Sequence, residues 1–241
     1  MRPEENGSSR EASAPASAPV AVRVTDGATP RTDSGAQPST KQARAALSTR
    51  KLLDAAAELI AEGGVNNTTL AMIGERAGYS HGLVTRRFGS KEGLLLALVD
   101  RMTLGWFETH VNPASRAAVG LEALRIRVDA IRGGWTISVR RMRALYSLMF
   151  EAAIQPIPSL TEKMQELNQV ALTSTSADTQ RGIDDGSIRL DVDPDAVARQ
   201  LTASFRGVAY LAMLLPDEFD VFDAFRDIDA YVDSLANTDE S

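Results

Sequence analysis

Three basic side chains, Arg86, Arg87 and Lys91, gather in the stretch GYSHGLVTRRFGSKEGLL of an otherwise acidic chain. Guanidinium and ammonium groups bind phosphate oxygens, and an arginine can also bind the two acceptors on the edge of guanine. Gly78 and Gly89 flank the two arginines, and glycine commonly ends a helix because it accepts a positive φ. The cluster is therefore expected on a short helix bounded by turns, an arrangement that suits the binding of a polyanion.

The distribution of charge along the chain points the same way. Residues 41–101 contain nine Lys or Arg against six Asp or Glu, whereas residues 102–241 contain 13 against 21. The formal net charge of the whole chain is −6. This asymmetry indicates a polyanion-binding module followed by a part that does not bind polyanions.

Composition excludes several classes of function. The 241 residues suffice for one large domain or two small ones. Without cysteine and with only two histidines, the chain offers no disulfide or thiolate, and no metal or cofactor is expected. We find no nucleophile–base pair or phosphate loop, so we expect no enzymatic activity. There is no membrane-length apolar run or secretory signal, and the expected location is the cytoplasm.

Apolar residues recur at helical spacing from Leu47 onward, and turn residues divide the pattern into short helices. The first helix ends at the glycine pair 63–64, Thr69 caps a second that ends at Gly78, and Ser80 caps a third. Two helices joined by such a tight turn form a helix-turn-helix, whose second helix enters the major groove of DNA. We therefore assign residues 46–92 to a helix-turn-helix DNA-binding domain.

The preceding residues, 1–45, have the composition of a disordered tail. Five of the ten prolines lie in the first 40 residues, which contain no Leu, Ile, Phe, Trp or Tyr. So few apolar side chains cannot offset the entropy lost on ordering. Alternatively, the end of this segment, with Lys41 and Arg44, acts as a basic arm on DNA. Residues 237–241 form a second short tail.

Residues 93–236 show helical periodicity without the alternation typical of strands, so the predicted fold class is all-α. Ser159 and Glu162 form a capping box that begins one of these helices. The last two helices, with Ala203, Gly207 and an apolar stripe across residues 221–235, suit a four-helix bundle across a two-fold axis. Another helix carries a single stripe formed by Val139, Met142, Tyr146, Met149 and Ala153.

The first part of the chain resembles a known family in both residue type and spacing. The runs TRKLLDAAAELIAEGG (49–64) and TTLAMIGERAG (68–78), followed by residues 79–92, resemble the TetR family of transcriptional regulators. The resemblance implies an all-α homodimer. It also implies an N-terminal three-helix DNA-binding domain and a C-terminal helical domain, here residues 93–236, for ligand binding and dimerisation.

Carried over by position, the resemblance puts Ser80, His81, Gly82 and Leu83 near bases. It puts Thr69, Arg87 and Lys91 near phosphates. Where the family commonly has a tyrosine that touches the DNA backbone, this chain has Thr85, whose hydroxyl reaches less far. The candidate DNA-binding residues are Arg50, Thr69, Ser80, His81, Gly82, Leu83, Thr85, Arg86, Arg87 and Lys91.

Eleven of the thirteen aromatic residues lie beyond residue 105, where they can line an apolar pocket between helices. The alternative is that these side chains form ordinary core. The candidate ligand-binding residues are Trp106, Phe107, Trp135, Met142, Tyr146, Met149, Phe150 and Met164.

The functional hypothesis is a ligand-responsive repressor that binds a palindromic operator as a homodimer. Its expected partners are double-stranded operator DNA, a second copy of the chain and a small-molecule effector of unknown identity, with no membrane association. The alternative is a DNA-binding regulator that is constitutive or controlled by a protein partner, without a small-molecule effector.

Overall fold

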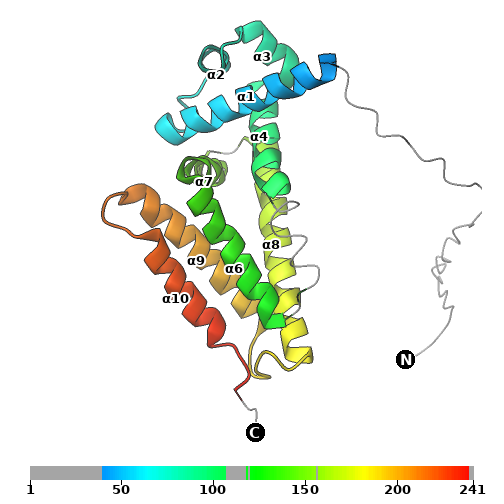
Figure 1. The fold of residues 1–241 in the computed structure, drawn as a ribbon, viewed down its shortest axis with the longest axis vertical. Coiled ribbons are helices and arrows are strands. Elements are labelled where there is room, and N and C mark those ends of the chain that lie inside the picture. The colour runs from blue at the N-terminus through cyan, green and yellow to red at the C-terminus, as the bar shows by residue number, and fades with distance from the viewer. Residues whose placement is uncertain (1–39, 107–117, 119, 156, 239–241) are drawn as a thin grey trace, which may run out of the picture. The chain divides into compact units, whose positions relative to one another are not determined.

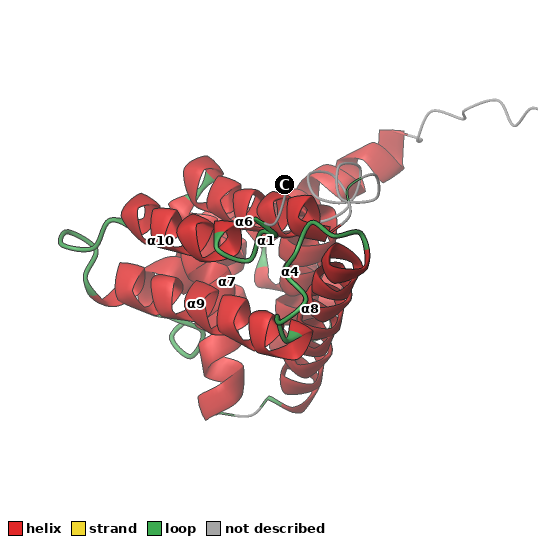
Figure 2. Cartoon of the chain, turned by 90° about the horizontal axis from the view of Figure 1, so that it is seen from below, coloured by secondary structure: helices red, strands yellow, loops and turns green. Residues whose placement is uncertain are grey.

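A computed structural model describes residues 40–106, 118, 120–155 and 157–238. Within these residues every regular element is a helix, and the one bridged pair of extended residues is Ile188 and Ala236. None of these helices is long and apolar enough to cross a membrane. The predicted all-α class is confirmed (Figures 1 and 2). The helices are α1 (Thr40–Gly63), α2 (Leu70–Ala77), α3 (His81–Phe88), α4 (Lys91–Trp106), α6 (Gly120–Ile137), α7 (Val139–Ile154), α8 (Pro158–Asp184), α9 (Pro194–Leu214) and α10 (Val221–Asp233).

The helix-turn-helix forms as the turn residues predict. The side-chain oxygen of Thr69 accepts from the Met72 amide at 3.2 Å, and that of Ser80 accepts from the Leu83 amide at 3.3 Å. These bonds satisfy amides that have no partner within the first turn of a helix. Gly78 ends α2 with φ at 75°, in the left-handed region. The predicted caps and the tight turn between α2 and α3 are therefore confirmed.

The first helix begins earlier than its apolar pattern. α1 starts at Thr40, seven residues before Leu47, so the expected helix start is wrong and the predicted boundary at residue 46 falls inside α1. Residues 40–47 are largely exposed, and a helical turn that packs against nothing leaves no apolar periodicity. Alanine, lysine, glutamine and arginine in these turns favour a helix by intrinsic propensity.

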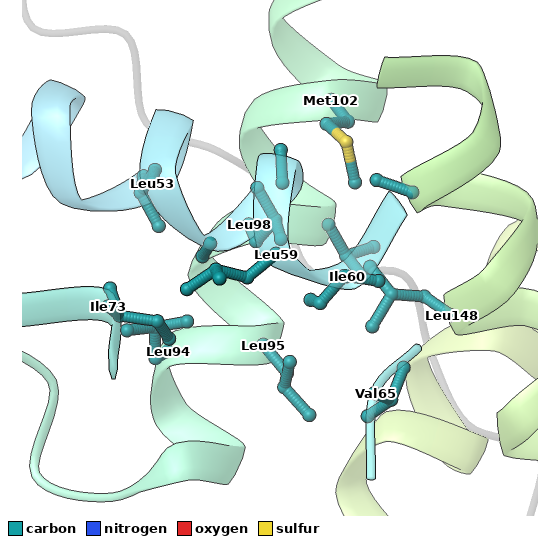
Figure 3. Packing of buried hydrophobic residues seen from close by; sticks show 14 of the residues in the cluster. Leu53, Leu59, Ile60, Val65, Ile73, Leu94, Leu95, Leu98, Met102 and Leu148 are labelled. Atoms are coloured by element: carbon teal, nitrogen blue, oxygen red, sulfur yellow. The ribbon is translucent and has the colours of Figure 1, made fainter. Parts of the chain in front are cut away.

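The short helices share one apolar core with the C-terminal helices (Figure 3). Its members come from α1, α2, α3 and α4 and from α7 and α8, and α1 packs directly against both α4 and α7. Because such a core is close-packed, α1 cannot move on α7 without repacking it. The largest buried members are Leu52, Ile60, Ile73, Leu94, Leu95, Leu98, Leu148 and Leu160.

A second core lies among α6, α7, α9 and α10. α7 contributes to both cores: Ala144, Leu148 and Ala152 lie in the first, and Met142, Tyr146 and Phe150 pack in the second. Both sets follow a spacing of four, and they are offset by two residues, which puts them on opposite sides of the helix. The single stripe predicted for this helix is therefore wrong at its ends, where Val139 and Ala153 are exposed.

The predicted capping box of α8 is also wrong. The helix begins at Pro158, and the capping position is Ile157, which makes no side-chain cap bond. The Ser159 amide donates instead to the carboxylate of Glu92 at 3.2 Å, and the Ser159 hydroxyl donates to the same oxygen. Glu92 belongs to the first turn of α4, so this bond joins two helices that local sequence signals treat separately.

The apolar stripe of the last helix is used inside the chain. Phe225, Ile228, Val232 and Leu235 are buried in the second core, which corrects the expectation that this stripe faces a second copy. The exposed apolar side chains of the last two helices are Tyr210, Leu214 and Phe222.

The turn between α2 and α3 leaves no space for a side chain at Gly74. A Cβ there would lie 2.8 Å from the Tyr79 carbonyl oxygen and 3.2 Å from Val84 Cγ2. We expect Gly74→Ala to lower the free energy of unfolding by about 1–3 kcal/mol, because the turn must open. Gly82→Ala is the matched control, since its Cβ meets nothing within 4 Å and alanine favours a helix. Denaturant titration of both variants checks this, and an equal effect would contradict it.

Candidate functional site

One face of α3 is polar and open to solvent. His81, Gly82, Thr85 and Arg86 are exposed, as is the capping residue Ser80, whereas Val84 is fully buried beneath them. Leu83 is half-buried at the edge of this face. The first turn of α3 thus presents the residues that the sequence predicts near bases. Their contact with DNA remains a prediction.

His81 and Thr85 are paired on this surface. The Thr85 hydroxyl oxygen lies 3.4 Å from His81 Nε2, one helical turn away. Thr85 is the shorter side chain that stands where the resembled family commonly has a tyrosine, and this contact is its side-chain partner in the structure. Both groups remain exposed and can exchange this weak bond for one to a phosphate oxygen.

Arg87 turns away from its neighbour Arg86 and binds α1. Its guanidinium donates to the Ala45 carbonyl at 3.0 Å, to the Thr49 hydroxyl at 2.8 Å and to the Ser48 hydroxyl at 3.0 Å. Three charge-assisted bonds hold the end of α3 against the first half of α1. The structure thus gives Arg87 partners inside the protein, and a phosphate contact would require it to exchange or share them.

Lys91 also has a partner inside the chain. Its ammonium donates to the Val65 carbonyl at 2.6 Å, in the loop between α1 and α2. Partial burial lowers the pKa of Lys91 from its ordinary value, and the carboxylate of Glu151 on α7 opposes that shift. Lys91 therefore fixes the loop that leads to Thr69, while its predicted phosphate contact remains untested.

The other two predicted phosphate contacts start from exposed positions. Thr69 uses its hydroxyl oxygen to cap α2, which leaves the hydroxyl proton available for donation. The side chain of Arg50 on α1 is 76% exposed, and its nearest carboxylate oxygen, on Asp54, is 4.0 Å away. So weakly held a guanidinium is free to reorient toward a polyanion.

The candidate ligand residues gather on the second core. The rings of Trp135 and Tyr146 stack with centroids 6.1 Å apart, and Phe150 follows at 6.2 Å from Tyr146. Met142 and Met149 pack against the same core. Trp135 is 2% exposed and its Nε1–H, buried with it, has no acceptor within the described residues. An unpaired buried donor of this kind is a place where a ligand oxygen can bind.

Sequence reasoning missed two members of this group, both on α9. The guanidinium of Arg206 lies 5.8 Å from the ring centre of Tyr146 and donates to Asn168 at 2.6 Å. Tyr210 meets the edge of Phe150 at 6.4 Å. Burial raises the pKa of the Tyr146 phenol, and the charge of Arg206 opposes that rise. No local signal marks Arg206, because only the packing of α9 on α7 brings it to the aromatic side chains.

Three candidates do not join this group within the described structure. Met164, on α8, lies in the first core. Trp106 is the last residue of α4, and its side chain lies outside what the structure describes, as does the whole of Phe107.

The sequence of this chain matches known regulatory proteins. The family described as "Bacterial regulatory proteins, tetR family" matches residues 52–98, which include all of α2 and α3. The transcriptional regulator BetI of Escherichia coli is 31% identical over 112 residues, which cover 45% of this chain and 56% of that protein. BetI of Burkholderia thailandensis is 37% identical over 82 residues, 34% of this chain and 40% of the other. These alignments span about half the length of the relatives.

The solved structure of the SmeT–triclosan complex is similar over most of the fold, with a TM-score of 0.67, 26% identity and coverage of 80% of this chain and 93% of that one. The helix-turn-helix region of this chain matches the TetR family. A second structure of SmeT, the repressor of the Stenotrophomonas maltophilia multidrug efflux pump SmeDEF, has a TM-score of 0.64 and 25% identity over 79% of this chain and 91% of that one. TetR-family regulators are DNA-binding transcription factors rather than enzymes.

The internal bonds of Arg87 generate a testable prediction. We expect Arg87→Ala to lower the free energy of unfolding by about 1–2 kcal/mol, because three acceptors on α1 lose a charged donor. It should leave the salt dependence of DNA binding unchanged, whereas Lys91→Ala should flatten the slope of log K against log salt by about 0.9. Denaturation and binding titrations at several salt concentrations measure both. If Arg87→Ala flattens the salt slope as much as Lys91→Ala does, Arg87 also contacts a phosphate.

Proposed function

We propose that this protein is a ligand-responsive transcriptional repressor that binds a palindromic operator as a homodimer. The observation that carries the proposal is the exposed polar face of α3, supported on a buried turn and on α1. This surface has the size and chemistry of a recognition helix, in which base-edge contacts come from the first turn. Arg86 can bind guanine, and Leu83 can contact the methyl group of thymine.

A second copy of the chain would supply the second recognition helix. Two helices reading successive major grooves need half-sites separated by about 34–36 Å. The exposed Tyr210, Leu214 and Phe222, together with the exposed small residues Ala203 and Gly207, support an interface on α9 and α10. Apolar side chains gathered on the last two helices are typical of a surface that an identical subunit covers.

The proposed response to a ligand rests on α7. This helix presents Tyr146 and Phe150 to the second core and Leu148 to the first. Polar contacts add to the connection, because Asn66 in the loop after α1 donates to Glu151 of α7 at 2.6 Å. A ligand that separates the aromatic side chains would shift α7, and α1 would follow. A coupling free energy of about 1–3 kcal/mol lowers operator affinity about 5- to 150-fold.

The first experiment is to select bound duplexes from a random DNA pool and compare variants on the selected sequence. We expect Leu83→Ala and Arg86→Ala to change base preference at defined positions, each by about 1–3 kcal/mol, because these side chains would meet base edges. Thr173→Ala, on the exposed surface of α8, is the control and should leave preference unchanged. Unaltered preference in both α3 variants would show that another face reads the DNA.

A ligand screen separates the proposal from the constitutive or partner-controlled alternative. Triclosan is one rational probe, since the related SmeT structure contains it. We expect an apolar aromatic compound to raise the melting temperature and to weaken operator binding about 5- to 150-fold. Phe150→Leu should reduce both effects, because it removes a ring from the group but keeps an apolar side chain. If no compound has either effect, the alternative without an effector is favoured.

A further inference from the structure

The N-terminal part of α1, which precedes the region that matches the family, carries basic and no acidic side chains. Residues 40–53 contain Lys41, Arg44, Arg50 and Lys51 and no Asp or Glu. Lys41 and Arg44 are exposed, and within the described residues neither has a carboxylate within 4.0 Å. The family match begins at residue 52, so it assigns these side chains no role. Unpaired cations on a helix surface retain their full attraction for phosphate.

The bonds of Arg87 determine where this surface lies. The guanidinium at the end of α3 reaches Ser48 and Ala45, so the first half of α1 lies beside the end of the recognition helix (Figure 1). Arg44 precedes Ser48 by four residues and Lys41 by seven, which puts all three on one side of α1. At 1.5 Å per residue, Lys41 lies about 10 Å further along the helix axis than Ser48. The two cations thus add positive charge on α1, beyond the end of α3 that Arg87 marks.

We propose that Lys41 and Arg44 bind the phosphates of double-stranded DNA that flank the base pairs read by α3. This inference rests on the proposed DNA-binding function and adds a second contact element, which carries affinity and not sequence preference. Phosphate contacts hold the protein in register on the duplex, whereas base contacts select the sequence. The two helical turns before residue 48 are largely exposed. Contact with DNA phosphates would explain why this exposed segment carries basic side chains.

The test uses the full chain carrying Lys41→Ala and Arg44→Ala together, with the duplex selected from the random pool. Alanine preserves helical propensity, so α1 should remain folded. Two lost phosphate contacts should flatten the salt slope by about 1.8, equivalent to about 30-fold weaker binding at 0.15 M salt. Base preference should not change. Trimming the duplex outside the α3 half-sites should reduce wild-type affinity to the level of the variant.

The matched control is Arg125→Ala with Arg189→Ala, which removes the same charge from exposed positions on α6 and on the segment after α8. We expect its salt slope to equal that of the wild type. An unchanged slope in the Lys41 and Arg44 variant would overturn the inference, as would an equal change in the control, which would indicate an effect of net charge alone. Failure of the wild-type protein to select any DNA would refute the proposed function itself, which distinguishes the two failures.

Discussion

The packing of α1 on α7 is the constraint on which the rest of this structure depends. Leu59 and Ile60 of α1 share a close-packed core with Leu148 of α7, and α2 and α4 contribute to the same core. α3 is attached to α1 through Arg87 and to α2 through the close turn at Gly74. The orientation of α3 relative to the C-terminal helices is therefore set by apolar contacts that a small displacement of α7 would disturb.

The two faces of α7 connect the second core to the first, which is the route that the proposed ligand response would use. Tyr146 lies among aromatic side chains of α6 and α7, and Leu148, two residues later, contacts the DNA-binding domain. At the end of this route, polar contacts from Asn66 to Glu151 and from Lys91 to the Val65 carbonyl connect the loop after α1 to α7 and α4. Coupling between distant sites requires an element of this kind that both sites can bias.

Basic side chains that are adjacent in sequence have different roles in the fold. Arg86 is exposed on the polar face of α3, while Arg87 is committed to three acceptors on α1. Lys91 holds a loop carbonyl. The charge of the cluster thus divides between groups that are free to meet DNA, such as Arg86, and groups with partners inside the protein. Of the latter, Arg87 has three acceptors, and Lys91 is expected to exchange its bond to the loop for one to a phosphate. Lys41 and Arg44, on exposed turns before the family match, add to the free group.

The sequence alone determined the all-α class, the caps at Thr69 and Ser80 and the left-handed turn at Gly78, because caps and turns depend on neighbouring residues. It could not show that Ser159 binds Glu92, that Arg87 binds Ser48 or that Arg206 covers Tyr146. Each of these contacts joins residues at least 39 positions apart, and nothing in a local window encodes such a distance. The sequence also did not predict the start of α1 at Thr40, for the opposite reason. A helical turn that buries no side chain leaves no periodic pattern of apolar residues.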